Sequence, residues 1–174
     1  MKYLVKFFVV TLLVLICTHS FAEQKIVVLD MKFVLNNSKA GKGGQDHLKK
    51  TFEDNQKKFS KMEKDLKKQE TDLLSQKNIL SKEEYSKQTD ALRKKVIDFQ
   101  SQRRSSIDKI ATQRAEMRET LIKKIEPIVD AYIKENNISL VMDKKSMLGG
   151  NTEYDITKTI TDKLDKVLPS LKLK

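Results

Sequence analysis

The chain has 174 residues, of which 34% are charged and only 6% aromatic, and it carries 35 basic against 24 acidic side chains. Such a composition, without a tryptophan, argues against a large globular core and favours an elongated helical body. The net charge of +11 favours anionic partners, which outside the cytoplasm means lipid headgroups, lipopolysaccharide or acidic polypeptides more than nucleic acid; the alternative is a basic surface that only keeps the chain soluble.

The first predicted element is a cleaved secretion signal over residues 1–22. Two lysines precede an apolar run from Phe7 to Cys17, which is shorter than the roughly 20 apolar residues that cross a bilayer. Small residues follow at Ser20 and Ala22, the two positions that a signal peptidase reads. We therefore expect the secreted chain to begin at Glu23.

Cys17, the only cysteine, has two interpretations. It is either removed with the signal or is a site of lipid attachment, although lipid attachment requires a small residue where Ile16 stands. Removal leaves a secreted chain of 152 residues with 33 basic and 24 acidic side chains and no cysteine. That chain has no disulfide and depends on packing alone.

Two stretches follow the predicted cleavage site. Residues 25–30, KIVVLD, are apolar over consecutive positions, which predicts a strand that is covered on both faces. Residues 40–46, AGKGGQD, fail as a phosphate loop, because Asn36 stands where the first glycine is required and Gly43 where a serine or threonine must bind magnesium. We expect a flexible lead-in to a helix there.

No catalytic, metal or cofactor site is predicted. The secreted chain has a single histidine, His47, and no second histidine or thiol that could complete a transition-metal site with it. Acidic pairs such as Glu83 and Glu84 fall on a charged helix face without an enclosing pocket. We therefore expect a protein that is not an enzyme.

Residues 45–126 contain neither glycine nor proline, which is typical of long helices. Seven of ten positions in strict 4,3 alternation are apolar, which predicts a coiled-coil seam. The seam is interrupted by three polar residues, Asn55, Gln69 and Gln76. They either fix its register or indicate that one flank of the helix is exposed to solvent. The ten positions are Leu48, Phe52, Asn55, Phe59, Met62, Leu66, Gln69, Leu73, Gln76 and Leu80.

A second helix is predicted to begin at Ser81, where Glu84 completes a capping box. Two helices joined at residues 79–82 form an antiparallel hairpin; the alternative is one continuous helix, because no glycine or proline enforces the turn. The second seam has a mean step near 3.6 after Phe99, which relaxes supercoiling. Its predicted members are Tyr85, Thr89, Leu92, Val96, Phe99, Arg103, Ile107, Ile110, Arg114, Met117, Leu121, Ile125, Ile128 and Tyr132.

The C-terminal region resembles the first strand segment in its pattern. Residues 138–143, ISLVMD, predict a strand that meets residues 25–30, because a hairpin returns its second end near its first. Residues 145–151 predict a third strand with a Gly149-Gly150 turn, and Asp155 is expected to cap a last helix. We therefore expect an α+β fold with a helical arm over residues 45–133 on a small body formed by residues 23–44 and 134–174.

Basic residues cluster on the second predicted helix at Lys94, Lys95, Arg103 and Arg104. They form either an ordinary solvated face or contacts to phosphates of a lipid or glycolipid headgroup. Three short strands bury too little apolar surface to stand alone, so we expect the sheet to be completed between subunits.

The order of these segments resembles the Skp/OmpH family of periplasmic chaperones. The similarity rests on KIVVLDMKFVLNNSKAGKG, NISLVMDKKSMLGG and YDITKTITDKL, including the DIT at 155–157, and it covers the whole secreted chain. It implies a homotrimer in which three arms surround a cavity that holds unfolded outer-membrane proteins without ATP.

The resemblance also implies roles for particular residues. It places Val27, Val28, Leu29, Leu140, Val141 and Met142 in the trimer body. It makes Lys95, Arg103 and Arg104, with Lys94 beside them, the nearest match to the family's lipopolysaccharide site.

Three functions remain open at this point. A holding chaperone is the leading hypothesis, since a diluted seam and dense positive charge give a large and weakly adhesive surface. A structural coiled-coil spacer or adaptor of the cell envelope is the alternative. A nucleic-acid binder is disfavoured, because the chain lacks base-stacking aromatics and carries a predicted secretion signal.

Overall fold

The computed structural model describes residue 3 and residues 24–172. The predicted secretion signal and Cys17 fall, apart from residue 3, outside the described residues. The elements in chain order are β1 (Ile26–Leu29), α2 (Met31–Asn37), α3 (Lys39–Ser75), α4 (Lys82–Glu135), β2 (Leu140–Asp143), two short 3-10 helices (Lys144–Ser146 and Thr152–Tyr154) and α5 (Thr157–Val167).

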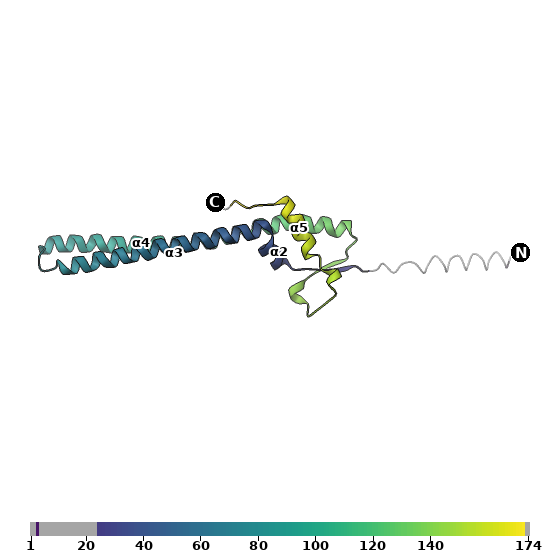
Figure 1. Cartoon of the computed structure of the whole chain (residues 1–174), viewed down its shortest axis with the longest axis horizontal. Coiled ribbons are helices and arrows are strands. Elements are labelled where there is room, and N and C mark those ends of the chain that lie inside the picture. The colour runs from purple at the N-terminus through teal and green to yellow at the C-terminus, as the bar shows by residue number, and fades with distance from the viewer. Residues whose placement is uncertain (1–2, 4–23, 173–174) are drawn as a thin grey trace.

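Helices α3 and α4 form the predicted antiparallel hairpin, which projects from a small body made of the remaining elements (Figure 1). The turn lies between Ser75 and Lys82. Helix α4 begins with the predicted capping box, in which the Glu84 N–H donates to Ser81 Oγ over 3.2 Å. The hairpin is therefore confirmed over one continuous helix, and α3 alone extends for about 55 Å.

The two predicted strands meet although the whole arm separates them in sequence. Strands β1 and β2 are parallel, with Ile26 opposite Leu140 and Leu29 opposite Asp143. On the other edge of β1, the Ile156 N–H donates to the Val28 carbonyl oxygen over 2.9 Å. Within the described residues, the sheet therefore consists of two strands and one isolated bridge.

The predicted third strand at residues 145–151 is wrong. Asp143 ends β2 and its Oδ1 accepts from the Lys145 N–H over 3.0 Å, which starts a 3-10 helix instead of an extended segment. The chain then reaches β1 only at Asp155, where the single bridge forms.

The body core lies where the end of α4 packs against α5 and α2. Leu121 and Ile125 of α4, Ile160 and Leu164 of α5, and Val34 of α2 are completely buried. The two long helices thus extend past residues 45 and 133, from Lys39 to Glu135. The base of the arm is part of the core of the body.

The predicted flexible lead-in at residues 40–46 is wrong, because this glycine-rich stretch is the first part of α3. The buried Ser38 caps α3, and its Oγ accepts from the Gly41 N–H over 3.2 Å. A Cβ at Gly41 would stand 2.0 Å from the Leu35 carbonyl oxygen. This glycine is therefore required by the close approach of α2 and α3.

The seam of α4 beyond Phe99 agrees with the prediction only in part. Ile110, Met117, Leu121 and Ile125 are buried as predicted. The predicted members Arg103, Ile107 and Arg114 are exposed, and the residues just before them, Gln102, Ser106 and Gln113, lie inward instead. A seam through Arg103 would bury charge, whereas a seam one residue earlier buries small or neutral polar groups at lower cost. The displacement leaves Ile107 facing solvent.

Candidate functional site

The candidate site is the surface of the arm and of its junction with the body. Residues 45–126 carry 21 basic and 15 acidic side chains. Within this segment, which is fully described, two of the basic side chains form ion pairs: Arg93 with Asp90 at 3.3 Å and Lys123 with Glu119 at 2.6 Å. Most of the arm's cations thus remain available to an anionic partner.

Large apolar side chains lie among these cations. Ile97 and Ile107 of α4 are 60% and 55% exposed, and Phe52 of α3 is 46% exposed. Near the turn, Leu74 and Ile79 are also exposed. Phe52 and Ile107 were predicted to lie in the seam, and Ile97 was not singled out, although its position next to the seam residue Val96 places it on the outer face.

Phe59 of α3 packs against Phe99 of α4, with ring centroids 6.0 Å apart in an edge-to-face arrangement. Between this contact and the body, an open crevice of about 600 Å³ lies between the two helices. Its walls include Thr51 and Asn55 of α3 and three serines of α4, Ser101, Ser105 and Ser106. The polar residue Asn55, predicted to interrupt the seam, therefore lies in a part of the seam that is open to solvent.

A second depression, the arm-root groove, lies where the arm joins the body and has a volume of about 620 Å³. Its apolar lining comes from α2, α3 and α4, and its rim is mostly basic. The apolar residues are Leu35, Leu48, Phe52, Ile110, Met117 and Leu121, and the charged residues are Asp46, Lys49, Arg114 and Arg118.

The four basic residues predicted as anion contacts do not form one face. At 3.6 residues per turn, Lys94 and Arg103 lie on opposite sides of α4, as do Lys95 and Arg104. Lys95 Nζ donates to Gln69 Oε1 of α3 over 2.7 Å, so this lysine bridges the two helices. In one subunit, the four side chains form a diffuse basic band around the arm.

The six predicted body residues divide into two groups. Val27, Val28 and Leu29 are buried within the subunit, whereas Val141 and Met142 are partly buried and Leu140 is 51% exposed. Leu140 pairs with the exposed Ile26, which lines a shallow depression together with Tyr154, and these three residues are called the body patch.

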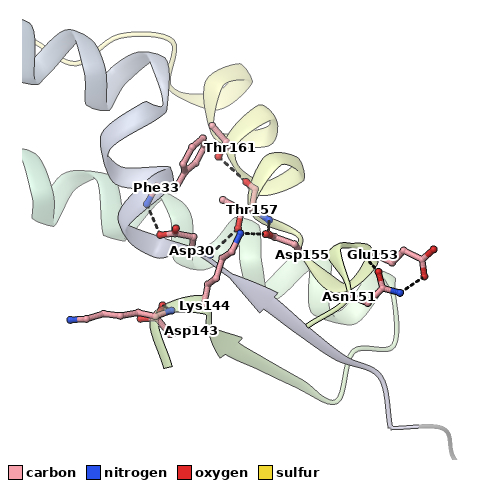
Figure 2. A network of polar contacts seen from close by, with 10 residues as sticks. Asp30, Phe33, Asp143, Lys144, Asn151, Glu153, Asp155, Thr157 and Thr161 are labelled. Atoms are coloured by element: carbon pink, nitrogen blue, oxygen red, sulfur yellow. Dashed lines mark hydrogen bonds and ion pairs between the residues drawn. The ribbon is translucent and has the colours of Figure 1, made fainter. Parts of the chain in front are cut away.

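A polar network fixes the C-terminal segment to this body (Figure 2). Thr157 Oγ1 accepts from the Asp30 N–H over 2.8 Å, and Asp155 Oδ1 accepts from the Thr157 N–H over 2.9 Å. Lys144 Nζ lies 2.6 Å from Asp155 Oδ2. Burial raises the pKa of Asp155, but hydrogen bonds from Lys144 and Thr157 outweigh this effect and lower the pKa below its ordinary value.

The DIT at 155–157 thus has a structural role. Asp155 and Thr157 supply the network, and Ile156 between them is buried and pairs with β1. The prediction that Asp155 caps the last helix is wrong, because the N-cap of α5 is Ile156 and Asp155 instead accepts from the N–H of Thr157, the first residue of the helix.

The described part of the chain holds neither a metal-binding cluster nor a helix suited to crossing a membrane. Its histidines, cysteines and carboxylates form no group of three that could hold a metal ion. None of its helices combines the length and apolarity needed to cross a membrane.

The fold places this chain among proteins that carry a long two-helix arm on a small two-stranded body. The surface of the arm is basic and partly apolar. The sequence model of the family described as outer membrane protein (OmpH-like) matches residues 25–164. The chain belongs to this OmpH-like family.

Two relatives agree with this assignment. A Skp-like protein of Pseudomonas aeruginosa is 25% identical over 167 residues, which cover 96% of this chain and 99% of that protein. The crystal structure of a Caulobacter crescentus protein, described as a candidate OmpH-like outer membrane chaperone, superposes with a TM-score of 0.79. It is 15% identical and covers 89% of this chain and 92% of that one, so it supports the fold.

Proposed function

We propose that this protein is an ATP-independent holdase chaperone of the periplasm, which binds unfolded outer-membrane β-barrel proteins between its helical arms and prevents their aggregation before membrane insertion. Membership of the OmpH-like family supports a role with outer-membrane clients. The predicted secretion signal supports the compartment.

The observation that carries the proposal is the mixed surface of the arm. Ile97 and Ile107 are exposed on a helix whose cations are mostly unpaired. Apolar groups bind exposed client side chains and the surrounding charge keeps the arms soluble, so many weak contacts add up while each remains quickly reversible.

Self-association into a homotrimer is part of this proposal. A two-stranded sheet is marginal alone, and the body patch leaves Ile26, Leu140 and Tyr154 in contact with solvent. A second subunit packed on the patch completes the sheet and brings the arms together around one space.

The basic band of Lys94, Lys95, Arg103 and Arg104 steers clients toward the arm and offers contacts to lipopolysaccharide or other anionic headgroups. Because these side chains point in different directions, we expect them to act on encounter more than on affinity. Reversing all four charges is expected to slow association with an unfolded porin more than it speeds release.

The test is light scattering of a urea-unfolded porin diluted into buffer with or without the secreted form of the protein. Suppression of aggregation should weaken with salt but persist at 1 M, where the Debye length is about 3 Å and only the apolar contacts remain. Complete loss at 1 M would leave the apolar part of the mechanism without support.

The second candidate is a structural spacer or adaptor of the cell envelope, favoured by the length of the hairpin. A spacer holds a folded partner and does not suppress aggregation of an unfolded porin. The same measurement therefore separates the two functions.

A further inference from the structure

The arm-root groove differs from the rest of the arm surface because its floor is continuous with the core of the body. Leu48, Met117 and Leu121 are buried beneath it, and Phe52 stands at its side with 46% of its surface exposed. An aromatic side chain that enters the groove meets a preformed apolar wall and leaves water at little conformational cost.

The rim of the groove adds a charge preference. Lys49 on α3 and Arg114 and Arg118 on α4 oppose the single carboxylate of Asp46. None of the three cations forms an ion pair with a carboxylate in the part of the chain that the structure describes. Arg114 and Arg118 are four residues apart on one helix, so they stand next to each other along the rim.

We propose that the arm-root groove is a docking site for short acidic–aromatic segments of an unfolded client, in which an aromatic side chain packs beside Phe52 and neighbouring carboxylates meet Arg114 and Arg118. A second copy of this chain fits less well, because its net positive charge opposes the basic rim. Barrel proteins carry girdles of aromatic residues at both membrane interfaces, which supply the aromatic part of such segments. The inference rests on the proposed function and adds the class of segment that is bound.

The test uses three short fluorescein-labelled peptides and fluorescence anisotropy with the secreted form of the protein. One peptide carries aromatic and aspartate residues, the second has lysine in place of every aspartate, and the third has serine in place of every aromatic residue. We expect the first to bind at least about tenfold more tightly than either of the others. The third peptide loses the burial of an aromatic side chain, and the second loses the charged contacts to Arg114 and Arg118.

Two variants locate the site. Phe52→Ser and the double variant Arg114→Gln with Arg118→Gln should each weaken the first peptide by about tenfold. The controls are Leu74→Ser, which removes an exposed apolar group elsewhere on α3, and Lys67→Gln with Lys68→Gln, which removes two charges outside the groove. Both controls should bind the peptide as the unmodified protein does, and circular dichroism establishes that every variant is folded.

Equal binding of the peptide by both groove variants and both controls would overturn the inference. Loss of self-association by Phe52→Ser in sedimentation velocity would also overturn it, in favour of a second copy as the occupant. Porin aggregation measured with the same proteins is the separate test of the proposed function, since the unmodified protein can suppress it without using this groove.

Discussion

At the scale of single residues, the fold depends on a few polar contacts and close approaches at the junction of arm and body. Asp155 and Thr157 tie α5 to β1, and the Lys39 N–H donates to Asp165 Oδ1 over 2.7 Å, which ties α5 to the start of α3. These contacts hold the base of the arm in one orientation relative to the body.

The Asp155 network makes stability depend on pH. Since the pKa of Asp155 is lowered in the folded chain, its contribution is present above its unfolded pKa of about 3.9 and is lost as the pH falls through the folded value. Asp155→Asn should reduce the free energy of unfolding at pH 7 by about 1 kcal/mol, because the hydrogen bonds lose their charge. Urea denaturation at pH 7 and pH 3 should show the difference between the two proteins shrinking in acid; a difference independent of pH would contradict this role.

Gly41 and Gly43 form a matched pair for testing the α2–α3 junction. A Cβ at Gly41 would collide with the Leu35 carbonyl oxygen, whereas a Cβ at Gly43 meets no atom within 4 Å. Gly41→Ala should destabilise the body by at least about 2 kcal/mol, and Gly43→Ala should stabilise α3 by about 0.5–1 kcal/mol. Thermal denaturation measures both, and similar effects of the two substitutions would show that the junction is looser than described.

At the scale of elements, the sequence predicts the features that depend on local rules. The capping box at Ser81 and Glu84 marks the start of α4, and consecutive apolar residues mark both strands. The third strand was mispredicted because a single side chain, Asp143, turns the chain. The periodicity of apolar residues does not reveal whether a local hydrogen bond will override an extended conformation.

The candidate site was harder to predict than the fold. A heptad pattern assigned Phe52 and Ile107 to the seam, but the residues just before them, Thr51 and Ser106, lie inward and leave both apolar side chains exposed. The register of α4 depends on whether Arg103 or Gln102 costs less free energy to bury. That difference depends on the side chains of the opposing helix. The arm-root groove needs three helices, so the sequence alone gives no sign of it.

The arm seam can be tested with two phenylalanines of the same helix. Phe59 is 9% exposed and packs on Phe99, while Phe52 is 46% exposed. Phe59→Ala should cost about 3 kcal/mol and Phe52→Ala below about 1 kcal/mol. Hydrogen exchange of α3 and α4 amides is the appropriate measurement, because it reports local opening of the arm separately from unfolding of the body. Equal loss of protection in both variants would contradict the seam described here.

At the scale of the whole molecule, the body and the arm have separate tasks. The body supplies a core at the base of the arm and, in our proposal, the contacts between subunits. The arm supplies a surface that is both basic and partly apolar. Because the two parts share α3 and α4, assembly of the bodies sets the positions of the arms.

Leu140→Asp tests the proposed assembly. Leu140 is 51% exposed in the single subunit, so the change should leave the fold intact, but it would bury an unpaired charge in an assembled sheet. We expect sedimentation velocity to show loss of trimers while circular dichroism retains the helical signal. A variant that remains trimeric would exclude the body patch as the contact between subunits. Leu74→Asp is the control, because Leu74 lies near the turn and is 58% exposed.

Native mass spectrometry of the secreted form of the protein, with and without a urea-unfolded porin, tests the central claim most directly. We expect a homotrimer without the porin and a complex of one trimer with one porin after its addition. A trimer that takes up no porin, or a protein that binds only the folded barrel, would contradict the holdase function and support the spacer.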